Sequence, residues 1–282
     1  MTLSGTTRVA GVMGWPVGHS LSPRLHGYWL SEYAIDGAYV PFPVMVDRLA
    51  DALRALPMLG IAGVNLTVPH KVAACAIVDT LDPAAKRIGA INTVVVGPDG
   101  ALDGLNTDTY GFITSIAEAA PGWAALAAPC VVIGAGGAAR AVCVALQDAG
   151  AVEIRLVNRT VARARDLAAE LGPPVTTAAW DERAAALDGA GLLVNATSLG
   201  MRGQPPLDLD LALLPRDAVV NDIVYVPLET PLLAAAARRG NRIVDGLGML
   251  LHQGRPGFAA WFGRDPSVTP AVRAHVLAGF AP

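Results

Sequence analysis

The chain has 282 residues but few cysteines, no long apolar run and no run of basic residues. Its three cysteines, Cys75, Cys130 and Cys143, form no CxxC pair, so neither a disulfide framework nor a zinc site is indicated. We expect them to be small core residues. No stretch reaches the roughly 18 uninterrupted apolar residues that a membrane span needs, so we expect no membrane partner.

Signals for targeting, nucleic acid and metal are missing as well. The N-terminal segment has no apolar signal-peptide core, which predicts a cytoplasmic protein. The net charge of -3 comes from interspersed signs, so no nucleic-acid partner is expected. The histidines show no HExxH spacing, and we predict no metal. A small molecule remains the expected partner, bound by a monomer or a homodimer.

Up to about residue 108, apolar runs of strand length alternate with helical stretches, which predicts an α/β sheet. Ser22-Pro23 and Asp82-Pro83 each predict a helix N-cap followed by proline at the first helical position. Residues 97–100 predict a tight reversal. The expected strands are 9–13, 38–42, 63–66 and 91–96.

The following segment shows a second series of strands and helices in alternation, typical of a parallel, doubly wound Rossmann-type domain. After residue 245 the chain is helical again and too short for a domain of its own, so we expect it to pack on the first region. The predicted domains are 1–108 with 246–282, and 109–245. The expected strands of the second series are 130–133, 153–157, 192–195, 218–224 and 242–244, and its expected helices include 137–149 and 161–171.

A glycine turn opens the second series. Residues 134–139 read GAGGAA and follow a buried strand directly, matching G-x-G-x-x-A. The first glycine permits the tight turn, the second lets the backbone approach a diphosphate, and the small Ala139 lets helix and strand pack closely. The pattern predicts a dinucleotide on the helix amides.

The next strand leads to Asn158-Arg159-Thr160, where an NAD enzyme would carry an acidic residue for the ribose 2′-hydroxyl. The carboxylate is absent, and Arg159 and Arg163 could pair with a 2′-phosphate. This favours NADP as cofactor. The alternative is that both arginines form only a solvated helix face.

Short polar side chains follow the expected strands of the first region. Ser20, Ser22, Thr67 and Asn92, with Asn65, stand at loop ends, where α/β sheets bind ligands. Hydroxyls and amides suit a ligand with several hydroxyl groups. The alternative is that Ser22 only caps a helix and Asn92 only forms a turn.

Lys71 and Asp108 are the candidate acid–base pair. Lys71 follows Pro69-His70 at an expected helix start, and Asp108 ends the stretch LNTD. If they meet, Lys71 could give a proton to a carbonyl oxygen as hydride arrives, and Asp108 could orient it. A structural ion pair is the competing interpretation.

Ordered motifs then join these features into one pattern, and the chain resembles the shikimate dehydrogenases. Several blocks in the right order are far more specific than the glycine turn alone. The blocks are GWPVGHSLSPRLH at 14–26, NLTVPHK at 65–71, GAINT at 89–93, GLNTDTYGF at 104–112, GAGGAAR at 134–140, NRT at 158–160, NATSLGM at 195–201, DIVYVP at 222–227 and DGLGMLLHQ at 245–253.

The resemblance implies reversible, NADPH-dependent reduction of 3-dehydroshikimate to shikimate in aromatic amino-acid biosynthesis. It implies Lys71 as proton donor or acceptor beside Asp108. The substrate contacts that it implies are Ser20, Ser22, Thr67, Asn92, Asp108, Tyr225 and Gln253. The implied cofactor contacts are Gly134, Ala135, Gly136, Gly137, Ala138, Asn158, Arg159, Thr160, Arg163, Thr197, Ser198, Leu199, Val224, Gly246 and Met249.

Three alternatives stay open. A quinate/shikimate dehydrogenase would share the fold and the Lys–Asp pair but often prefers NAD. A methylenetetrahydrofolate dehydrogenase would share the architecture, although nothing in the SLSP block indicates a site for a pterin. A non-catalytic NADP sensor is the third alternative, and the intact Lys71 and Asp108 argue against it.

Overall fold

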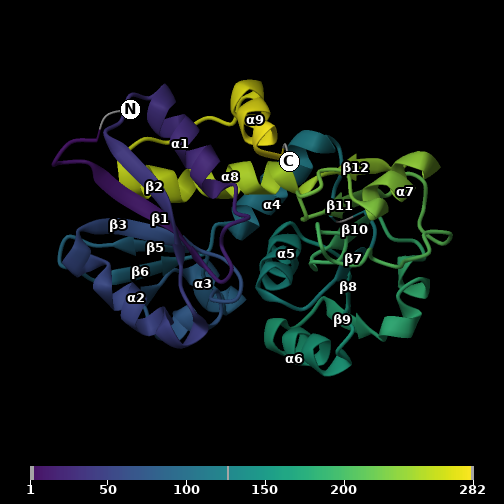
Figure 1. Ribbon diagram of the computed structural model, residues 1–282. Helices are drawn as coiled ribbons and strands as arrows, with labels where there is room; N and C mark the ends of the chain where they lie inside the picture. The colour runs from purple at the N-terminus through teal and green to yellow at the C-terminus, as the bar shows by residue number, and fades with distance from the viewer. Residues whose placement is uncertain (1–2, 126, 281–282) are drawn as a thin grey trace. The chain divides into compact units, whose positions relative to one another are not determined.

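Two six-stranded sheets organise the chain (Figure 1). The computed structural model describes residues 3–125 and 127–280. By its internal contacts the chain divides into a first unit, Met1–Thr107 with Leu251–Pro282, and a second unit, Asp108–Leu250. The expected α/β class with two domains is confirmed.

The first sheet has the strand order β2-β1-β3-β5-β6-β4. β1 pairs in parallel with β2 and β3, whereas β5 runs antiparallel to both β3 and β6. The predicted reversal at 97–100 is confirmed, since the Gly97 amide donates to the Ala101 carbonyl at 2.8 Å and closes the β5–β6 hairpin. The strands are β1 (Arg8–Gly14), β2 (Gly37–Pro43), β3 (Ile61–Leu66), β4 (Thr80–Leu81), β5 (Thr93–Val96) and β6 (Leu102–Leu105).

The helices of the first unit are α1 (Ser22–Glu32), α2 (Leu49–Ala55), α3 (Pro83–Ile88), α9 (Pro270–Leu277) and part of α8 (Gly246–Phe262). Its 3-10 turns are η1 (Val46–Arg48), η2 (Pro57–Leu59), η3 (Ala73–Ala76) and η6 (Ala278–Phe280). Asp82 caps α3 as predicted, because its carboxylate accepts from the Ala85 amide at 2.6 Å. The prediction for Ser22 is wrong: Leu21 is the N-cap of α1 and no side chain caps it. The Ser22 hydroxyl bonds to Tyr39 instead.

Helix α1 carries His26 into a buried aromatic cluster of the first unit. The His26 ring stacks on Tyr39 with centroids 3.9 Å apart and meets the Trp29 ring edge-on at 5.5 Å. Phe258 and Trp261 of α8 close the other sides. Burial lowers the pKa of His26 to about 3, so the ring is neutral inside the cluster.

The second sheet has the order β12-β11-β10-β7-β8-β9, and every pairing in it is parallel. Strand order therefore reverses between β7 and β10, as in a dinucleotide-binding Rossmann sheet. Two apolar clusters cover its faces, one under α5 (Gly137–Asp148) and α6 (Val161–Leu171) and the other under α7 (Pro231–Arg239). The strands are β7 (Cys130–Ile133), β8 (Ile154–Val157), β9 (Val175–Ala178), β10 (Leu192–Asn195), β11 (Val219–Asp222) and β12 (Arg242–Val244).

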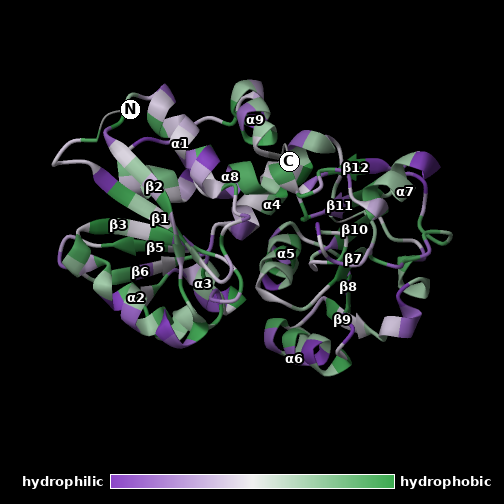
Figure 2. Ribbon diagram, in the orientation of Figure 1, coloured by the Kyte–Doolittle hydropathy of each residue, from purple (hydrophilic) through white to green (hydrophobic). Residues whose placement is uncertain are grey.

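The helices of the second unit are α4 (Asp108–Ala119), α5 (Gly137–Asp148), α6 (Val161–Leu171) and α7 (Pro231–Arg239), with 3-10 turns η4 (Trp180–Glu182) and η5 (Ala185–Leu187). Figure 2 shows both hydropathy colours along α2 and α6, as expected for helices with one buried face. In α6 that face carries Ala164 and Leu167. Cys130 and Cys143 lie in the core of this unit as expected, and burial raises the pKa of each thiol to about 12.

Helix α8 (Gly246–Phe262) crosses the division between the units. Its first five residues belong to the second unit, where Gly248 lies against Ser115 and Met249 joins the apolar core. From Leu251 onward it belongs to the first unit, and there the Trp261 indole donates to the Val94 carbonyl at 3.1 Å. The contact-based division thus falls before Asp108 and after Leu250, one residue earlier and five residues later than the boundaries expected from the sequence.

Among the described residues, no helix has the length and apolar character required to cross a bilayer.

Candidate cofactor and substrate sites

The glycine turn between β7 and α5 has a backbone that only glycine adopts easily. Gly134 has φ of +119°, and a Cβ there would lie 2.9 Å from the Ala196 carbonyl oxygen. Gly136 is the extended N-cap of α5, and a Cβ on it would meet no atom within 4 Å. The N-terminus of α5 therefore has open space at Gly136, and the amides of a first helical turn have no partner within the helix, which fits the diphosphate of a dinucleotide.

The loop after β8 carries the residues predicted to read the ribose. The Asn158 side-chain amide donates to the Thr160 carbonyl at 2.9 Å, and the Arg163 backbone amide donates to the same carbonyl at 3.1 Å. Arg159 and Arg163 are both exposed. No carboxylate stands between residues 158 and 163, so the donor set suits an added phosphate.

The loop after β10 is held by Asn195, which is fully buried. Its side-chain oxygen accepts from the Thr197 amide at 3.1 Å and from the Thr197 hydroxyl at 2.7 Å. The Thr197 hydroxyl in turn accepts from the Leu199 amide at 3.0 Å, while Ser198 is exposed. These bonds give the predicted cofactor segment 197–199 a defined backbone.

The loop after β11 lies against the start of α8. Val224 is buried and Tyr225 half-buried. A Cβ on Gly246 would stand 2.3 Å from the Ile223 carbonyl oxygen and 2.7 Å from that of Val224, so only glycine allows this approach. The segments predicted to bind cofactor thus follow β7, β8, β10 and β11 or pack on those loops, and all belong to the second unit.

A buried polar network in the first unit joins residues far apart in the sequence. The Asn92 side-chain amide donates to the Thr107 hydroxyl at 2.9 Å and to the Gln253 side-chain oxygen at 3.1 Å. The Thr107 hydroxyl donates to the Gln253 carbonyl at 2.8 Å, and the Thr107 amide donates to the Asn92 side-chain oxygen at 2.9 Å. The structure therefore brings Asn92 and Gln253 together and adds Thr107, which the sequence did not single out as a contact.

A second chain of hydrogen bonds leads from Asn92 to the serine loop. The Asn65 side-chain amide donates to the Asn92 carbonyl at 3.1 Å, and the Asn65 oxygen accepts from the Tyr39 hydroxyl at 2.6 Å. That hydroxyl also bonds to Ser22, whose amide donates to the Ser20 hydroxyl at 3.3 Å. Burial raises the pKa of Tyr39 well above its usual range, so the hydroxyl keeps its proton.

Sequence reasoning missed Tyr39. A tyrosine on a buried strand needs a partner for its hydroxyl, and that requirement was the available signal. The partner could not be named, because the partners lie on β3 and α1.

Lys71 lies in the turn after β3, half-buried, and not at the start of an α-helix as expected. The chain there forms only the short turn η3, two residues later. The Lys71 carbonyl accepts from the Ile91 amide at 2.9 Å, which fixes its backbone beside Asn92. Thr67 precedes it, half-buried, with its amide bonded to the Met13 carbonyl at 2.9 Å.

Asp108 is the first residue of α4 and has only 3% of its surface exposed. It directly follows Thr107 of the Asn92 network. Lys71 belongs to the first unit, and Asp108 and Tyr225 belong to the second.

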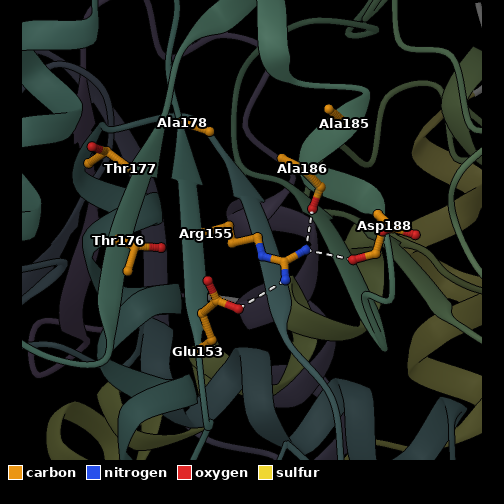
Figure 3. Close-up of a pocket in the computed structure, with 8 residues that line it drawn as sticks. All are labelled: Glu153, Arg155, Thr176, Thr177, Ala178, Ala185, Ala186 and Asp188. Carbon is orange, nitrogen blue, oxygen red and sulfur yellow. Dashed lines mark hydrogen bonds and ion pairs between the residues drawn. The ribbon is translucent and has the colours of Figure 1, made fainter.

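Two surface hollows lie outside these clusters. One of about 340 Å³ lies over β8, β9 and η5 (Figure 3). Its Arg155 donates to the Ala186 and Asp188 carbonyls at 2.9 and 2.6 Å and to the Glu153 carboxylate at 3.0 Å, so the guanidinium is held by the protein. The other, of about 600 Å³, includes Trp15 and Met45. Neither is lined by a residue predicted to bind substrate or cofactor.

Comparison with protein families gives three matches in chain order. Residues 12–94 match the shikimate dehydrogenase substrate binding domain. Residues 119–201 match the shikimate / quinate 5-dehydrogenase family, and residues 246–277 match the shikimate 5′-dehydrogenase C-terminal domain.

Individual relatives cover nearly the whole chain. A protein of Paramagnetospirillum magneticum named shikimate dehydrogenase (NADP(+)) is 61% identical over 98% of this chain and 100% of its own length. The structure of a Thermus thermophilus shikimate 5-dehydrogenase in complex with NADP(H) and shikimate matches with a TM-score of 0.85 at 36% identity, covering 98% of this chain and 100% of that one. A quinate dehydrogenase from Corynebacterium glutamicum in complex with NAD matches with a TM-score of 0.89 at 30% identity, over 96% and 99% of the two chains. The chain belongs to the shikimate dehydrogenase family.

Proposed function

We propose that this chain is an NADP-dependent shikimate dehydrogenase, which reversibly reduces 3-dehydroshikimate to shikimate. The observation that carries the proposal is the 61% identity, from end to end, to a relative named for that activity. The absent carboxylate after β8 supports the choice of NADP over NAD.

Substrate recognition is assigned to polar side chains that the fold already holds in place. Ser20 in the loop before α1 and Ser22, the first residue of α1, would bind the carboxylate or a hydroxyl, together with Thr67 after β3. Asn92 and Gln253 are oriented by each other and by Thr107 before any ligand arrives. Such preorganisation reduces the entropy lost when a polyhydroxylated ligand binds. Tyr225 is proposed as a further substrate contact.

Cofactor binding is assigned to the second unit. The turn Gly134–Ala138 would hold the diphosphate, Asn158–Thr160 and Arg163 the phosphorylated ribose, and Thr197–Leu199 with Val224, Gly246 and Met249 the remainder. When bound, NADPH supplies the hydride that reduces the substrate carbonyl carbon. The residues themselves bind, orient and keep the cofactor in one register.

Lys71 is proposed as the proton donor in the reducing direction. As the carbonyl oxygen becomes a hydroxyl it takes one proton, and the Lys71 ammonium can give it and regain it from solvent. Asp108 is proposed to orient that ammonium toward the substrate oxygen. In the oxidising direction Lys71 accepts the proton of the shikimate hydroxyl.

One assay compares four combinations of shikimate or quinate with NADP or NAD, each followed by absorbance of the reduced cofactor. We expect the highest kcat/KM for shikimate with NADP. A higher value for quinate with NAD would instead identify a quinate dehydrogenase. Binding of NADP without reduction in any combination would identify the sensor.

Two coarser points complete the proposal. We propose that the active form is a monomer or a homodimer, and analytical ultracentrifugation at micromolar concentration distinguishes the two. A cytoplasmic location is supported by the cysteine content, three in 282 residues with no CxxC pair, since small secreted domains commonly carry many disulfide-forming cysteines. Fractionation of cells expressing a tagged chain tests it.

A further inference from the structure

Asp222 is a buried carboxylate with no role in the proposed chemistry. It ends β11, has no exposed surface, and accepts hydrogen bonds from the Asn195 side-chain amide at 3.0 Å, the Val224 amide at 3.0 Å and the Thr230 hydroxyl at 2.7 Å. None of these donors is charged. Burial raises the pKa of Asp222 to about 6. An unpaired buried carboxylate is costly, so its presence calls for a reason beyond filling space.

The first of its contacts reaches the loop after β10. The Asn195 amide that donates to Oδ1 of Asp222 also donates to the Leu199 carbonyl at 3.0 Å. The side-chain oxygen of Asn195 accepts two hydrogen bonds from Thr197, one from its backbone amide and one from its hydroxyl. One oxygen of Asp222 therefore orients the amide group on which segment 197–199 is built.

The second contact reaches the loop after β11. The same oxygen, Oδ1, accepts from the Val224 amide and turns the backbone there. The carbonyls of Ile223 and Val224 face Gly246 at distances that exclude a side chain at that position. A shift of this turn would displace the start of α8 as well.

The third contact, through Oδ2, is of a different kind. It goes to the hydroxyl of Thr230, which caps α7 by accepting from the Leu233 amide at 3.3 Å. This contact concerns the helix and touches none of the predicted cofactor segments. Oδ1 of Asp222 therefore bonds to the two loops, whereas Oδ2 bonds to the residue that caps α7.

We propose that Asp222 is a positioning residue for NADP: its Oδ1 ties the loops after β10 and β11 together, so that segment 197–199, Val224 and Gly246 present one preformed surface to the cofactor. The inference rests on the proposed function, because it assumes that these segments bind NADP. Loss of this tie leaves each loop to be ordered at the moment of binding, at a cost in affinity.

The test measures the Kd for NADP by calorimetry without substrate, together with the melting temperature. Asp222→Ala is expected to raise Kd by at least about 10-fold. Thr230→Val is the matched control, because it removes the Oδ2 contact and the α7 cap but leaves both loop contacts. We expect it to lower the melting temperature while changing Kd by less than about 3-fold.

Equal Kd values for Asp222→Ala and the wild type would overturn the inference, as would an equal rise of Kd in Thr230→Val. If Asp222→Ala does not fold, Asn195→Leu breaks the same tie from the other side, and wild-type affinity in that variant refutes the proposal. A wild-type protein that binds no NADP would instead remove the proposed function. A wild type that binds NADP beside an unaffected Asp222→Ala refutes the positioning role alone.

Discussion

Replacement of His26 by phenylalanine should change how stability depends on pH. His26 has no exposed surface, and neither ring nitrogen has a hydrogen-bond partner. Its ring is held by Tyr39 and Trp29, and Gly254 packs beside it, since a Cβ there would lie 3.4 Å from Nε2. An imidazolium in this cluster would be desolvated without compensation, which is why burial lowers the pKa to about 3.

The direction of the effect follows from proton uptake. Below pH 6.5 the unfolded chain binds a proton at His26 that the folded chain does not bind. The free energy of unfolding therefore falls as pH falls, by about 1.4 kcal/mol per pH unit, until the folded histidine titrates near pH 3. Between pH 6.5 and 5 the loss is roughly 2 kcal/mol, and over the whole window it is about 5 kcal/mol.

His26→Phe keeps an aromatic ring and removes the titration. Urea unfolding of the wild type and the variant from pH 7.5 to 5 gives the difference in their free energies of unfolding. The contributions of the other titrating groups are the same in both proteins and cancel in this difference. We expect the wild type to lose about 2 kcal/mol relative to the variant as pH falls from 6.5 to 5. Phe258→Leu is the control: it loosens the same cluster without removing a proton site, so its difference from the wild type should be flat. A flat difference for His26→Phe would refute the reasoning.

Three further predictions concern the proposed sites. Arg159→Ala should raise the KM for NADP by on the order of 10- to 100-fold with little effect on NAD. Arg165→Ala, exposed on the following helix α6, should change neither KM, and equal weakening of both cofactors by Arg159→Ala would contradict the 2′-phosphate contact. Lys71→Ala should lower kcat by a factor of ~10² to 10⁴, while equilibrium dialysis should show that shikimate still binds. Lys86→Ala, at an exposed lysine, is the control, and near-normal turnover of Lys71→Ala would exclude the proton-transfer role. Burial raises the pKa of Asp222 from 3.8 to about 6, so the wild type should lose roughly 2.5 kcal/mol of stability relative to Asp222→Asn as pH rises from 4 to 7. Urea unfolding measures the difference, and the opposite slope would contradict the assignment.

Local elements were predictable because their causes are local. The strands 130–133, 192–195 and 242–244 and the helix 161–171 have the bounds expected from apolar period and from caps. β4, β6 and β9 were not predicted, because a segment of two to four residues that contains Asp, Gly or Thr shows no clear alternation of apolar and polar residues. They exist because a neighbouring strand offers hydrogen bonds, which only the assembled sheet provides.

The sites divide in the same way. Gly134 and the missing carboxylate after β8 could be recognised from the sequence, because backbone strain at one residue and charge at one loop are properties of short segments. The bond between Asn92 and Gln253, the hydroxyl of Tyr39 on Asn65, and the three donors around Asp222 could not.

The sequence by itself indicated the glycine turn and the preference for NADP, because each depends on residues within a few positions of one another. It also indicated the doubly wound pattern, because each strand and helix in the alternating series carries its own local signal. The tertiary structure alone decided which buried polar groups meet, since Asn92 and Gln253 are 161 positions apart and only the packing of α8 in the first unit brings them within hydrogen-bond distance. It also decided that Ser22 bonds to Tyr39 rather than capping its helix. A hydroxyl takes the partner that the fold places beside it, and that partner is not set by sequence spacing.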